Sequence, residues 1–227
     1  MKLTLDRVQR MLMGAGLNRP ERRKTEILAA ARGVFLRQGY PDTGMEVVAR
    51  MAGVSTATLY TYFPSKAKLF EVVIHETVRD MAGPVRASTR VKGDARARLM
   101  ALTCAYATFF SRPMTRATFR LITSERRRFQ VLADFFLRNA REELGRAAIR
   151  VIDDLVETGE LKVEKPSWAA GQLLGMIDHP TLLLGLSAGD NVQPNRPLEE
   201  LSRDAVETFL ARYGNNRVVP QPSPARS

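Results

Sequence analysis

The stretch Gly53-Val54-Ser55-Thr56-Ala57-Thr58-Leu59-Tyr60-Thr61-Tyr62-Phe63 has the pattern of a tight turn followed by a short helix. Gly53 can end a preceding helix, because glycine adopts the left-handed backbone conformation at little cost. Ser55 can cap the next helix, since its hydroxyl accepts from free amides two or three residues on. A turn of this length sets two helices at a steep angle, so the stretch predicts a helix-turn-helix over about residues 44–63.

Apolar residues on the N-terminal side of the turn repeat at helical spacing. Met45, Val48 and Ala52 lie three or four residues apart and predict one buried stripe. Asp42 or Thr43 can cap this helix at its start. The pattern therefore predicts a short helix that ends at the glycine.

Longer helices flank the motif. Asn18 and Glu21 fit a capping box, with Pro20 in the first turn, where its missing N–H costs nothing. The helix that begins there is expected to stop near Gly39. After the motif, Ser65 can cap a further long helix.

The second helix of the motif has one apolar and one polar face. Leu59 and Phe63, four residues apart, point toward a small core. The side chains expected outside are Thr56, Ala57, Thr61 and Tyr62. Small and hydroxylated side chains suit a major groove, where a helix must approach base edges and phosphates closely. The motif therefore predicts DNA binding.

Residues 27–70 resemble the DNA-binding region of the TetR family of transcriptional regulators. The matches occur in order and without a gap, at Ile27-Leu28, Ala31, Phe35, Gly39-Tyr40, Thr43, Val48-Ala49, Ala52-Gly53-Val54-Ser55, Leu59-Tyr60, Tyr62-Phe63, Lys66 and Leu69-Phe70. The family usually has a hydroxyl residue after Thr43, where this chain has Gly44. Either Thr43 takes over that helix cap and phosphate contact, or the phosphate contact is absent.

The resemblance implies two subunits whose recognition helices enter successive major grooves, roughly 34–36 Å apart or somewhat more. The implied DNA-binding residues are Thr56, Ala57, Thr61 and Tyr62 for close approach and base contact, Thr43, Tyr60 and Lys66 for the DNA backbone, Arg22, Arg23 and Lys24 for positive charge, and Gly44, Ser55 and Thr58 beside them. The expected partner is a palindromic operator in double-stranded DNA.

The chain of 227 residues carries a formal charge of +11, from 35 Lys+Arg against 24 Asp+Glu. Residues 1–73 hold twelve basic and six acidic residues, so the excess is densest around the motif. Polyanion binding is the natural interpretation, and a merely soluble basic surface is the alternative. The single cysteine, Cys104, excludes an intrachain disulfide and fits the cytoplasm, where a buried, inert thiol is the expected state.

The rest of the chain predicts helices and no useful strand, so the fold class is all-α. The expected segments are 65–82, 94–111, 114–124, 129–158, 167–188 and 198–213, with breaks at Gly83-Pro84, Arg112-Pro113, Gly159, Lys165-Pro166 and 189–197. No apolar run approaches the roughly 20 residues that span a bilayer. We expect an N-terminal arm over 1–20, a three-helix DNA-binding domain over 21–81, a larger helical domain over 82–213 and a disordered tail over 214–227.

Aromatic residues are frequent in the expected C-terminal domain. Core packing explains most of them, and the TetR resemblance implies an effector cavity between these helices as the alternative. The candidate pocket residues are Cys104, Tyr106, Phe109, Phe110, Phe119, Ile122, Phe135, Phe136, Met176 and His179. His179 enters this set because Pro180 inside a helix usually kinks it and can open a cavity.

The two final helices have more apolar surface than one partner requires. They either pair with their symmetry mates, as the resemblance implies for a homodimer, or bury both faces within one subunit. The candidate dimer residues are Leu173, Ile177, Leu184, Leu201, Ala205 and Phe209. A third open case is Arg126-Arg127-Arg128, either a solvated helix end or a contact to an anion.

Residues suited to catalysis are sparse. His75 and His179 are the only histidines, no Cys/His spacing fits a metal site, and no glycine loop fits a phosphate or a cofactor. We therefore expect a ligand-responsive, cytoplasmic and nucleoid-associated transcriptional regulator, with no enzymatic activity, cofactor, metal or membrane partner. An architectural DNA-binding or adaptor protein, and an activator with the same DNA-binding head, remain the alternatives to a repressor released by a small apolar effector.

Overall fold

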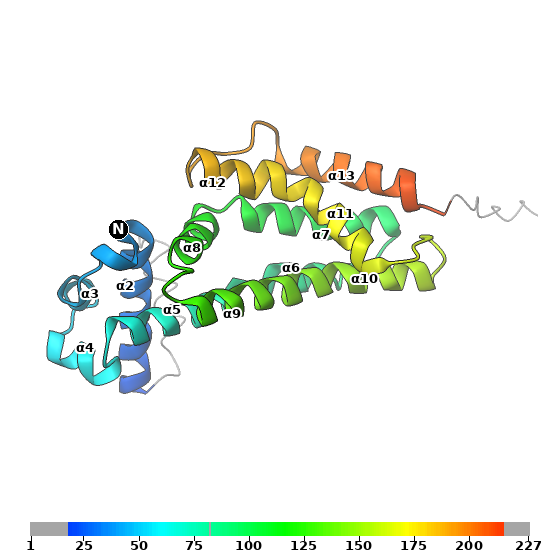
Figure 1. The fold of residues 1–227 in the computed structure, drawn as a ribbon. Coiled ribbons are helices and arrows are strands. Elements are labelled where there is room, and N and C mark those ends of the chain that lie inside the picture. The colour runs from blue at the N-terminus through cyan, green and yellow to red at the C-terminus, as the bar shows by residue number, and fades with distance from the viewer. Residues whose placement is uncertain (1–17, 82, 216–227) are drawn as a thin grey trace, which may run out of the picture. The chain divides into compact units, whose positions relative to one another are not determined.

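The computed structural model describes residues 18–81 and 83–215, and this part of the chain is helical apart from one isolated antiparallel bridge between Leu161 and Gly214. The helices of the first half are α2 (Arg19–Asp42), α3 (Met45–Met51), α4 (Thr56–Tyr62), α5 (Lys66–Met81), α6 (Gly83–Ser88) and α7 (Ala95–Phe110). Those of the second half are α8 (Pro113–Ser124), α9 (Gln130–Ala140), α10 (Arg146–Glu157), α11 (Pro166–Asp178), α12 (Leu184–Ala188) and α13 (Leu198–Tyr213) (Figure 1). Two π-helical turns, η1 (Arg141–Gly145) and η2 (His179–Leu183), complete the set.

The chain divides into two compact units. Unit 1 contains residues 1–77 and 121–132, and unit 2 contains residues 78–120 and 133–227. The sequence predicts one boundary at residue 81, whereas the segment 121–132 from the middle of the chain also belongs to unit 1. No described helix is both long enough and apolar enough to cross a membrane.

The core of unit 1 is built on α2. Ile27, Ala31 and Phe35 repeat every four residues along it and are fully buried. The predicted start is confirmed, because the Asn18 side chain accepts from the Glu21 amide at 3.0 Å, and residues 1–17 of the expected arm lie outside the described residues. The predicted stop is also found, since the backbone leaves the helical conformation at Gly39, where φ is +78°.

The start of α3 differs from the prediction. Gly44 occupies the N-cap position and makes no side-chain cap, so neither Asp42 nor Thr43 caps this helix. Thr43 is 2% exposed, and its hydroxyl donates to the Gly39 carbonyl at 2.6 Å. Thr43 therefore closes the end of α2 instead of the start of α3.

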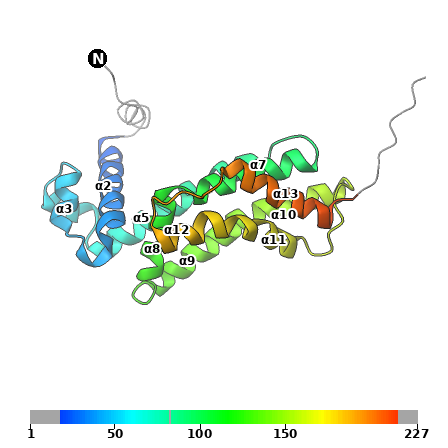
Figure 2. The same cartoon turned by 90° about the horizontal axis from the view of Figure 1, so that it is seen from above.

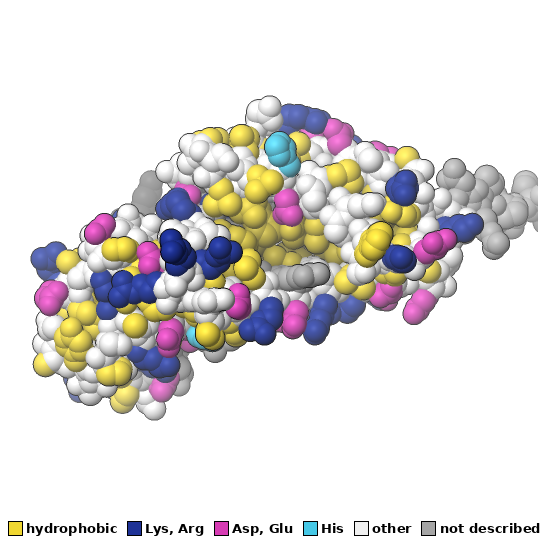
Figure 3. Space-filling model, in the orientation of Figure 1, with side chains coloured by type: hydrophobic (Ala, Val, Ile, Leu, Met, Phe, Trp, Pro, Cys, Tyr) yellow, Lys and Arg dark blue, Asp and Glu magenta, His cyan; other side chains and the backbone are white. Residues whose placement is uncertain are grey.

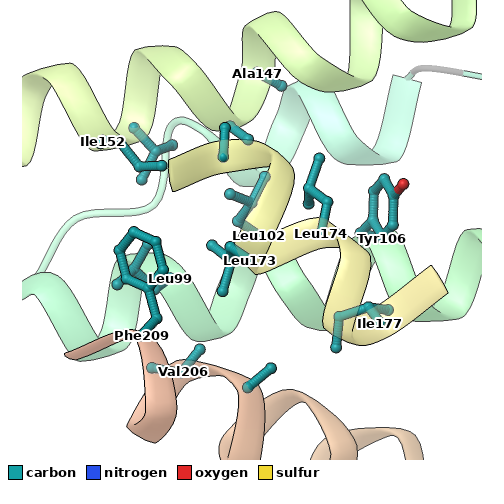
Figure 4. Packing of buried hydrophobic residues seen from close by; sticks show 14 of the residues in the cluster. Leu99, Leu102, Tyr106, Ala147, Ile152, Leu173, Leu174, Ile177, Val206 and Phe209 are labelled. Carbon is teal, nitrogen blue, oxygen red and sulfur yellow. The ribbon is translucent and has the colours of Figure 1, made fainter. Parts of the chain in front are cut away.

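The core of unit 2 lies where α7, α10, α11 and α13 meet. Figure 4 shows Leu99 and Leu102 of α7 pointing toward Leu173 of α11, with Val206 and Phe209 of α13 beside them. The views of Figures 1 and 2 agree that α7 and α13 run side by side. All five of these side chains are at most 2% exposed, so the hydrophobic effect holds this bundle together within one subunit.

Two helices that the sequence predicts as continuous are each interrupted by a π-helical turn. The segment predicted over 129–158 is interrupted by η1, and the one over 167–188 by η2. In η2, Pro180 has no N–H to donate to the fourth residue before it, and Leu184 donates to the His179 carbonyl five residues back. Helix α6 was not predicted; it begins at the predicted break Gly83-Pro84, where Pro84 fits a first helical turn.

The first residues of the predicted tail are part of the fold. The Lys162 amide donates to the Tyr213 carbonyl at 2.8 Å, and the Asn215 amide donates to the Glu160 carbonyl at 2.9 Å. These bonds attach the end of α13 to the loop after α10. Residues 216–227 lie outside the described residues.

Candidate DNA-binding surface and ligand site

The recognition helix α4 is positioned by the turn that the sequence predicts. Gly53 has φ +66°, and Ser55 caps α4 by accepting from the Thr58 amide at 3.1 Å. On the inner side, Leu59 is fully buried and Phe63 is 2% exposed. The inner face is thus fixed to the core of unit 1, which leaves the other face free for a partner.

The outer face of α4 is polar and close to the backbone. Ala57, Tyr60 and Thr61 are exposed, and Tyr60 retains 45% of its surface. Thr61 donates to the Ala57 carbonyl at 3.0 Å, an internal bond that fixes its hydroxyl. Thr56, Thr58 and Tyr62 are half-buried along the same helix. This face carries small side chains and hydroxyl groups, which suit close approach to base edges and phosphates in a major groove.

Positive charge lies at the start of α2. Arg22 and Lys24 are exposed and Arg23 is half-buried, so each of the three predicted cations has surface that a phosphate can reach. Arg22 pairs with Glu26 at 3.3 Å on the surface. An exposed ion pair contributes little free energy, so Arg22 can leave Glu26 and bind a phosphate at small cost. A further cation that was not predicted is Arg50, which is exposed in the last turn of α3, directly before the turn of the motif.

Lys66 has a different role from the predicted phosphate contact. Its ammonium donates to the carbonyls of Tyr40, Pro41 and Thr43, each at 2.9 Å. An ammonium has three donors, so these three bonds use all of them. Lys66 therefore ties the start of α5 to the C-terminal end of α2. Thr43 is 2% exposed, so its side chain offers little surface to a phosphate.

We expect Lys66→Met to destabilise the protein by about 1–3 kcal/mol, because it removes the donors from three backbone carbonyls while keeping the side-chain stem. Urea unfolding followed by circular dichroism measures this loss. Lys68→Met is the matched control, since Lys68 is exposed and pairs with Glu71 on the surface at 3.1 Å. Equal stability of the two variants would contradict the tethering role of Lys66.

An aromatic cluster explains why residues 121–132 belong to unit 1. The Tyr40 ring lies 4.8 Å from Phe129 and 5.1 Å from Phe70, between centroids. The Arg128 guanidinium stacks over Tyr40 at 4.6 Å, with the Lys66 ammonium 4.7 Å from the same ring. Of the three arginines left open by the sequence, Arg128 thus makes a cation–π contact inside the unit. Ile122, predicted for the effector pocket, is buried in this unit 1 segment instead.

Most other predicted pocket residues form a packed series of rings in unit 2, which we call the aromatic series. Its neighbouring ring centroids are 4.6–5.5 Å apart, in the order Phe109, Phe110, Phe119 and Phe136, with Tyr106 against Phe110. Tyr106, Phe109, Phe110 and Phe136 are at most 5% exposed. Phe135 is half-buried, whereas Met176 and His179 are exposed.

A shallow groove of about 410 Å³ lies between α7 and the start of α13. Its lining is Met100, Ala101, Cys104, Thr108, Leu198 and Glu199. The structure thus brings one of the predicted pocket residues, Cys104, to this groove and places the aromatic series elsewhere. The thiol is half-buried rather than enclosed.

A second depression, which we call the apolar hollow, has a hydrophobic surface in Figure 3. It lies between α11–η2 on one side and the continuous run α9–η1–α10 on the other. Asp178, the last residue of α11, is the one acidic residue from Pro166 to Ala188. The Tyr106 hydroxyl donates to Asp178 Oδ1 at 2.8 Å. Burial and then the charge of Asp178 raise the pKa of Tyr106 above its ordinary value, so this hydroxyl stays protonated and donates.

Asp178 makes the folded state less stable at neutral pH. Burial is the main cause that raises the pKa of its carboxyl above 3.8, and the bond from Tyr106 lowers it in part. A raised folded pKa means that ionisation opposes folding at every pH above it, and that this cost disappears as the pH falls through the folded pKa toward 3.8. No pattern in the sequence signals this pair, because 72 positions separate the two residues.

We therefore expect Asp178→Asn to raise the melting temperature at neutral pH, by about 2–4 °C for each kcal/mol recovered. The amide oxygen can still accept from Tyr106, so the hydrogen bond is kept. Thermal melts across a pH series from neutral to acid test the sign, since the difference from the parent should shrink as the pH falls. A variant that melts lower than the parent at neutral pH would contradict the expectation.

The predicted dimer residues divide into two groups. Leu173, Ile177, Ala205 and Phe209 are at most 3% exposed and belong to the core of unit 2, so their assignment to a dimer interface is corrected. The apolar faces of α11 and α13 that carry these residues are buried within one subunit, which is the alternative that the sequence left open. Leu184 is 39% exposed and Leu201 is half-buried.

Two family profiles match the chain. Residues 27–73 match the bacterial regulatory proteins of the tetR family, and residues 97–215 match the AefR-like transcriptional repressor, C-terminal domain. The chain is also 40% identical over 96 residues to the HTH-type transcriptional activator FasR of Mycolicibacterium smegmatis. That match covers 42% of this chain and 43% of the relative, so the chain spans less than half the length of this relative.

Solved structures extend the likeness to most of the fold. A TetR-family regulator from Mesorhizobium loti is 26% identical, with a TM-score of 0.79, over 88% of this chain and 100% of the other. The flavonoid-responsive regulator FrrA is 28% identical, with a TM-score of 0.66, over 86% of this chain and 99% of its own. Regulators of this family are not enzymes. The chain belongs to the TetR family and is a DNA-binding transcriptional regulator with an AefR-like C-terminal domain.

Proposed function

We propose that this protein binds a palindromic operator as a homodimer in the bacterial cytoplasm and that a small apolar effector releases it. The observation that carries the proposal is the recognition helix α4, whose buried Leu59 anchors an outer face that exposes Ala57, Tyr60 and Thr61. Arg22 and Lys24 supply positive charge on the same unit. The remaining DNA contacts are proposed for the half-buried Thr56, Thr58 and Tyr62, with Ser55 as cap and Gly44 beside it.

We propose that the dimer interface uses the exposed face of α11–α12, opposite the face that packs in the core of unit 2. Trp168, Met176, Leu183 and Leu184 are between 36% and 68% exposed along this run. Gly171 and Gly175 are exposed between them and leave room for close approach of a second helix. Burial of such apolar surface favours association, and a palindromic site needs two reading heads. The half-buried Leu201 of α13 can contribute at the edge.

Effector binding is proposed for unit 2. The apolar hollow and the groove beside Cys104 offer apolar surface there, and FrrA is named as flavonoid-responsive. The division between the units falls inside α5, α8 and α9, so three continuous helices lead from unit 2 into unit 1. An effector acts only if it binds the released state more tightly than the DNA-bound state.

Repression is the proposed direction of control. The C-terminal profile describes a repressor, whereas FasR is named an activator. FasR is named an HTH-type regulator, so a head of this type does not by itself fix the direction, which depends on where the operator lies relative to the promoter. A reporter with the operator overlapping the promoter should be more active when the protein is absent.

Selection from a randomised duplex pool tests the proposed function directly. We expect one palindromic motif to be enriched by the purified protein, and Tyr60→Phe to weaken binding to all duplexes alike, because its hydroxyl is assigned to the DNA backbone. A shift in base preference would reassign Tyr60 to base contact. No enrichment at all would support a non-specific architectural protein instead.

A further inference from the structure

The loop between α8 and α9, residues 125–129, belongs to the same compact unit as the recognition helix α4. Its backbone closes into a turn, because the amides of Arg128 and Phe129 both donate to the Glu125 carbonyl at 3.0 Å. The Phe129 ring fixes the turn to the end of α2, with its centroid 4.8 Å from that of Tyr40. The side chains that this loop exposes are therefore held in place on unit 1.

The loop exposes two arginines that have no ion pair. Arg126 and Arg127 are exposed, and neither pairs with an acidic residue in the described part of the chain. The neighbouring acidic residue, Glu125, is half-buried. A guanidinium is a planar fork of donors that matches the oxygens of a phosphate. These two arginines can bind such a group without breaking an existing ion pair.

The loop lies beside the place where the sequence predicts a phosphate contact from Lys66. The Lys66 ammonium is 4.7 Å from the centre of the Tyr40 ring, and the Arg128 guanidinium is 4.6 Å from the same centre. Lys66 follows the last residue of α4 by four positions and bonds to the carbonyl of Thr43, directly before the N-cap of α3. The loop thus adjoins the helix-turn-helix, and it carries unpaired cations where the donors of Lys66 are already used.

We propose that Arg126 and Arg127 bind backbone phosphates of the DNA, on the flank of the major groove that α4 enters. The inference rests on the proposed function only in requiring a bound duplex, and it needs neither the effector nor a direction of control. Helix α4 has no basic side chain, so cations on neighbouring segments must supply the attraction to DNA.

DNA suits this pair of arginines better than an acidic protein does. Neutralising phosphates on a duplex releases condensed counterions, whereas an exposed ion pair with a protein carboxylate contributes little. Phosphate contacts carry no sequence information, so the two arginines set affinity and the register of the protein on the duplex. They leave the choice of bases to α4.

Gel shifts of the full-length protein on the selected operator, repeated across a salt series, test the inference. Replacing both Arg126 and Arg127 by glutamine, which we call the loop variant, should weaken binding to every duplex alike, by roughly tenfold or more. The slope of log affinity against log salt should become shallower by about 1 for each phosphate that is no longer neutralised. Both residues are exposed, so the melting temperature should stay unchanged.

Two matched variants separate a phosphate contact from a change in net charge. Arg126→Lys with Arg127→Lys keeps both charges and should retain the salt slope of the parent protein. Arg90→Gln with Arg150→Gln removes the same two charges from exposed arginines of unit 2, neither of which has an ion pair among the described residues. This control variant should keep the slope and the affinity close to those of the parent protein.

Ethylation interference locates the contacts on the operator. Some phosphates whose ethylation blocks binding of the parent protein should no longer matter for the loop variant. The inference alone is overturned if the parent selects an operator while the loop variant matches the control variant in affinity, slope and interfering phosphates, and an acidic protein would then be the better partner for the loop. A parent protein that binds no duplex at all would overturn the proposed function as well.

Discussion

Raising the salt concentration from 50 to 200 mM should weaken operator binding by about 10³- to 10⁴-fold. The recognition helix carries no basic side chain, so its affinity must come in large part from cations around it, such as Arg22, Lys24 and Arg50. If about six to eight phosphates are neutralised per dimer, the logarithm of affinity falls with the logarithm of salt at a slope of about −5 to −7. Gel shifts on one operator across a salt series measure the slope.

Single substitutions give this prediction a control. Arg50→Ala should reduce the magnitude of the slope by about 1 for each phosphate that is no longer neutralised, and it should weaken binding to all duplexes alike. Lys68→Ala changes the same charge at a residue already paired with Glu71 and gives the reference for a simple decrease in net charge. A flat response of the parent protein to salt would refute the phosphate-contact model.

The second large effect is expected at Arg116 in α8, a fully buried cation in unit 2. Its guanidinium donates to the Phe110 carbonyl at 3.0 Å and to the Asp190 carbonyl at 2.9 Å, and it also reaches the carbonyl of Val192. Its Nη2 has no hydrogen-bond partner among the described residues. Arg116 thus joins α8 to the loop after α12, and its removal leaves these carbonyls and a cavity behind.

We expect Arg116→Ala to lower the free energy of unfolding by roughly 3–5 kcal/mol, in the range of other large-to-small substitutions in buried sites. Chemical denaturation measures the change. Arg120→Ala is the control, since the Arg120 side chain is 48% exposed and its ion pair with Asp190 is open to solvent on the arginine side, so it should contribute less than about 1 kcal/mol. Comparable destabilisation of both variants would contradict the structural role of Arg116.

Gly185→Ala provides an independent check of how tightly Arg116 is packed, because Gly185 of α12 lies against the Arg116 side chain. A methyl group there would lie 2.7 Å from Arg116 Cζ and would overlap the neighbouring atoms of the same side chain. The guanidinium cannot move away cheaply, because carbonyls hold it. We expect a destabilisation of about 1–3 kcal/mol, typical of overpacking, and none of this size for Gly171→Ala, where nothing lies within 4 Å.

The helix-turn-helix could be predicted from the sequence because its determinants are local. The left-handed Gly53, the Ser55 cap and the inward pair Leu59 and Phe63 act within a few residues of one another, and the structure confirms each. The same holds for Asn18 at the start of α2. By contrast, the predicted cap of α3 was wrong, since the Thr43 hydroxyl bonds backward to Gly39 once the chain turns there.

Helical periodicity also predicted most of the bundle, but it could not say which apolar face meets which partner. Leu173 and Phe209 fit a stripe in a dimer interface as well as they fit a stripe in the core, because apolar residues recur at the same helical spacing in both cases. Packing within unit 2 buries these two residues in the core and leaves Trp168 and Leu184 outside.

The family, the all-helical class and the outer face of α4 that we propose to contact DNA follow from the order of the amino acids, because short-range capping, turn chemistry and helical period specify these features. Three other features depend on folding in three dimensions: Lys66 closes the end of α2, Phe129 joins unit 1, and Tyr106 holds Asp178. These interactions join residues 23 to 89 positions apart. Their partners are chosen by how whole helices pack, and no local pattern in the chain encodes that choice.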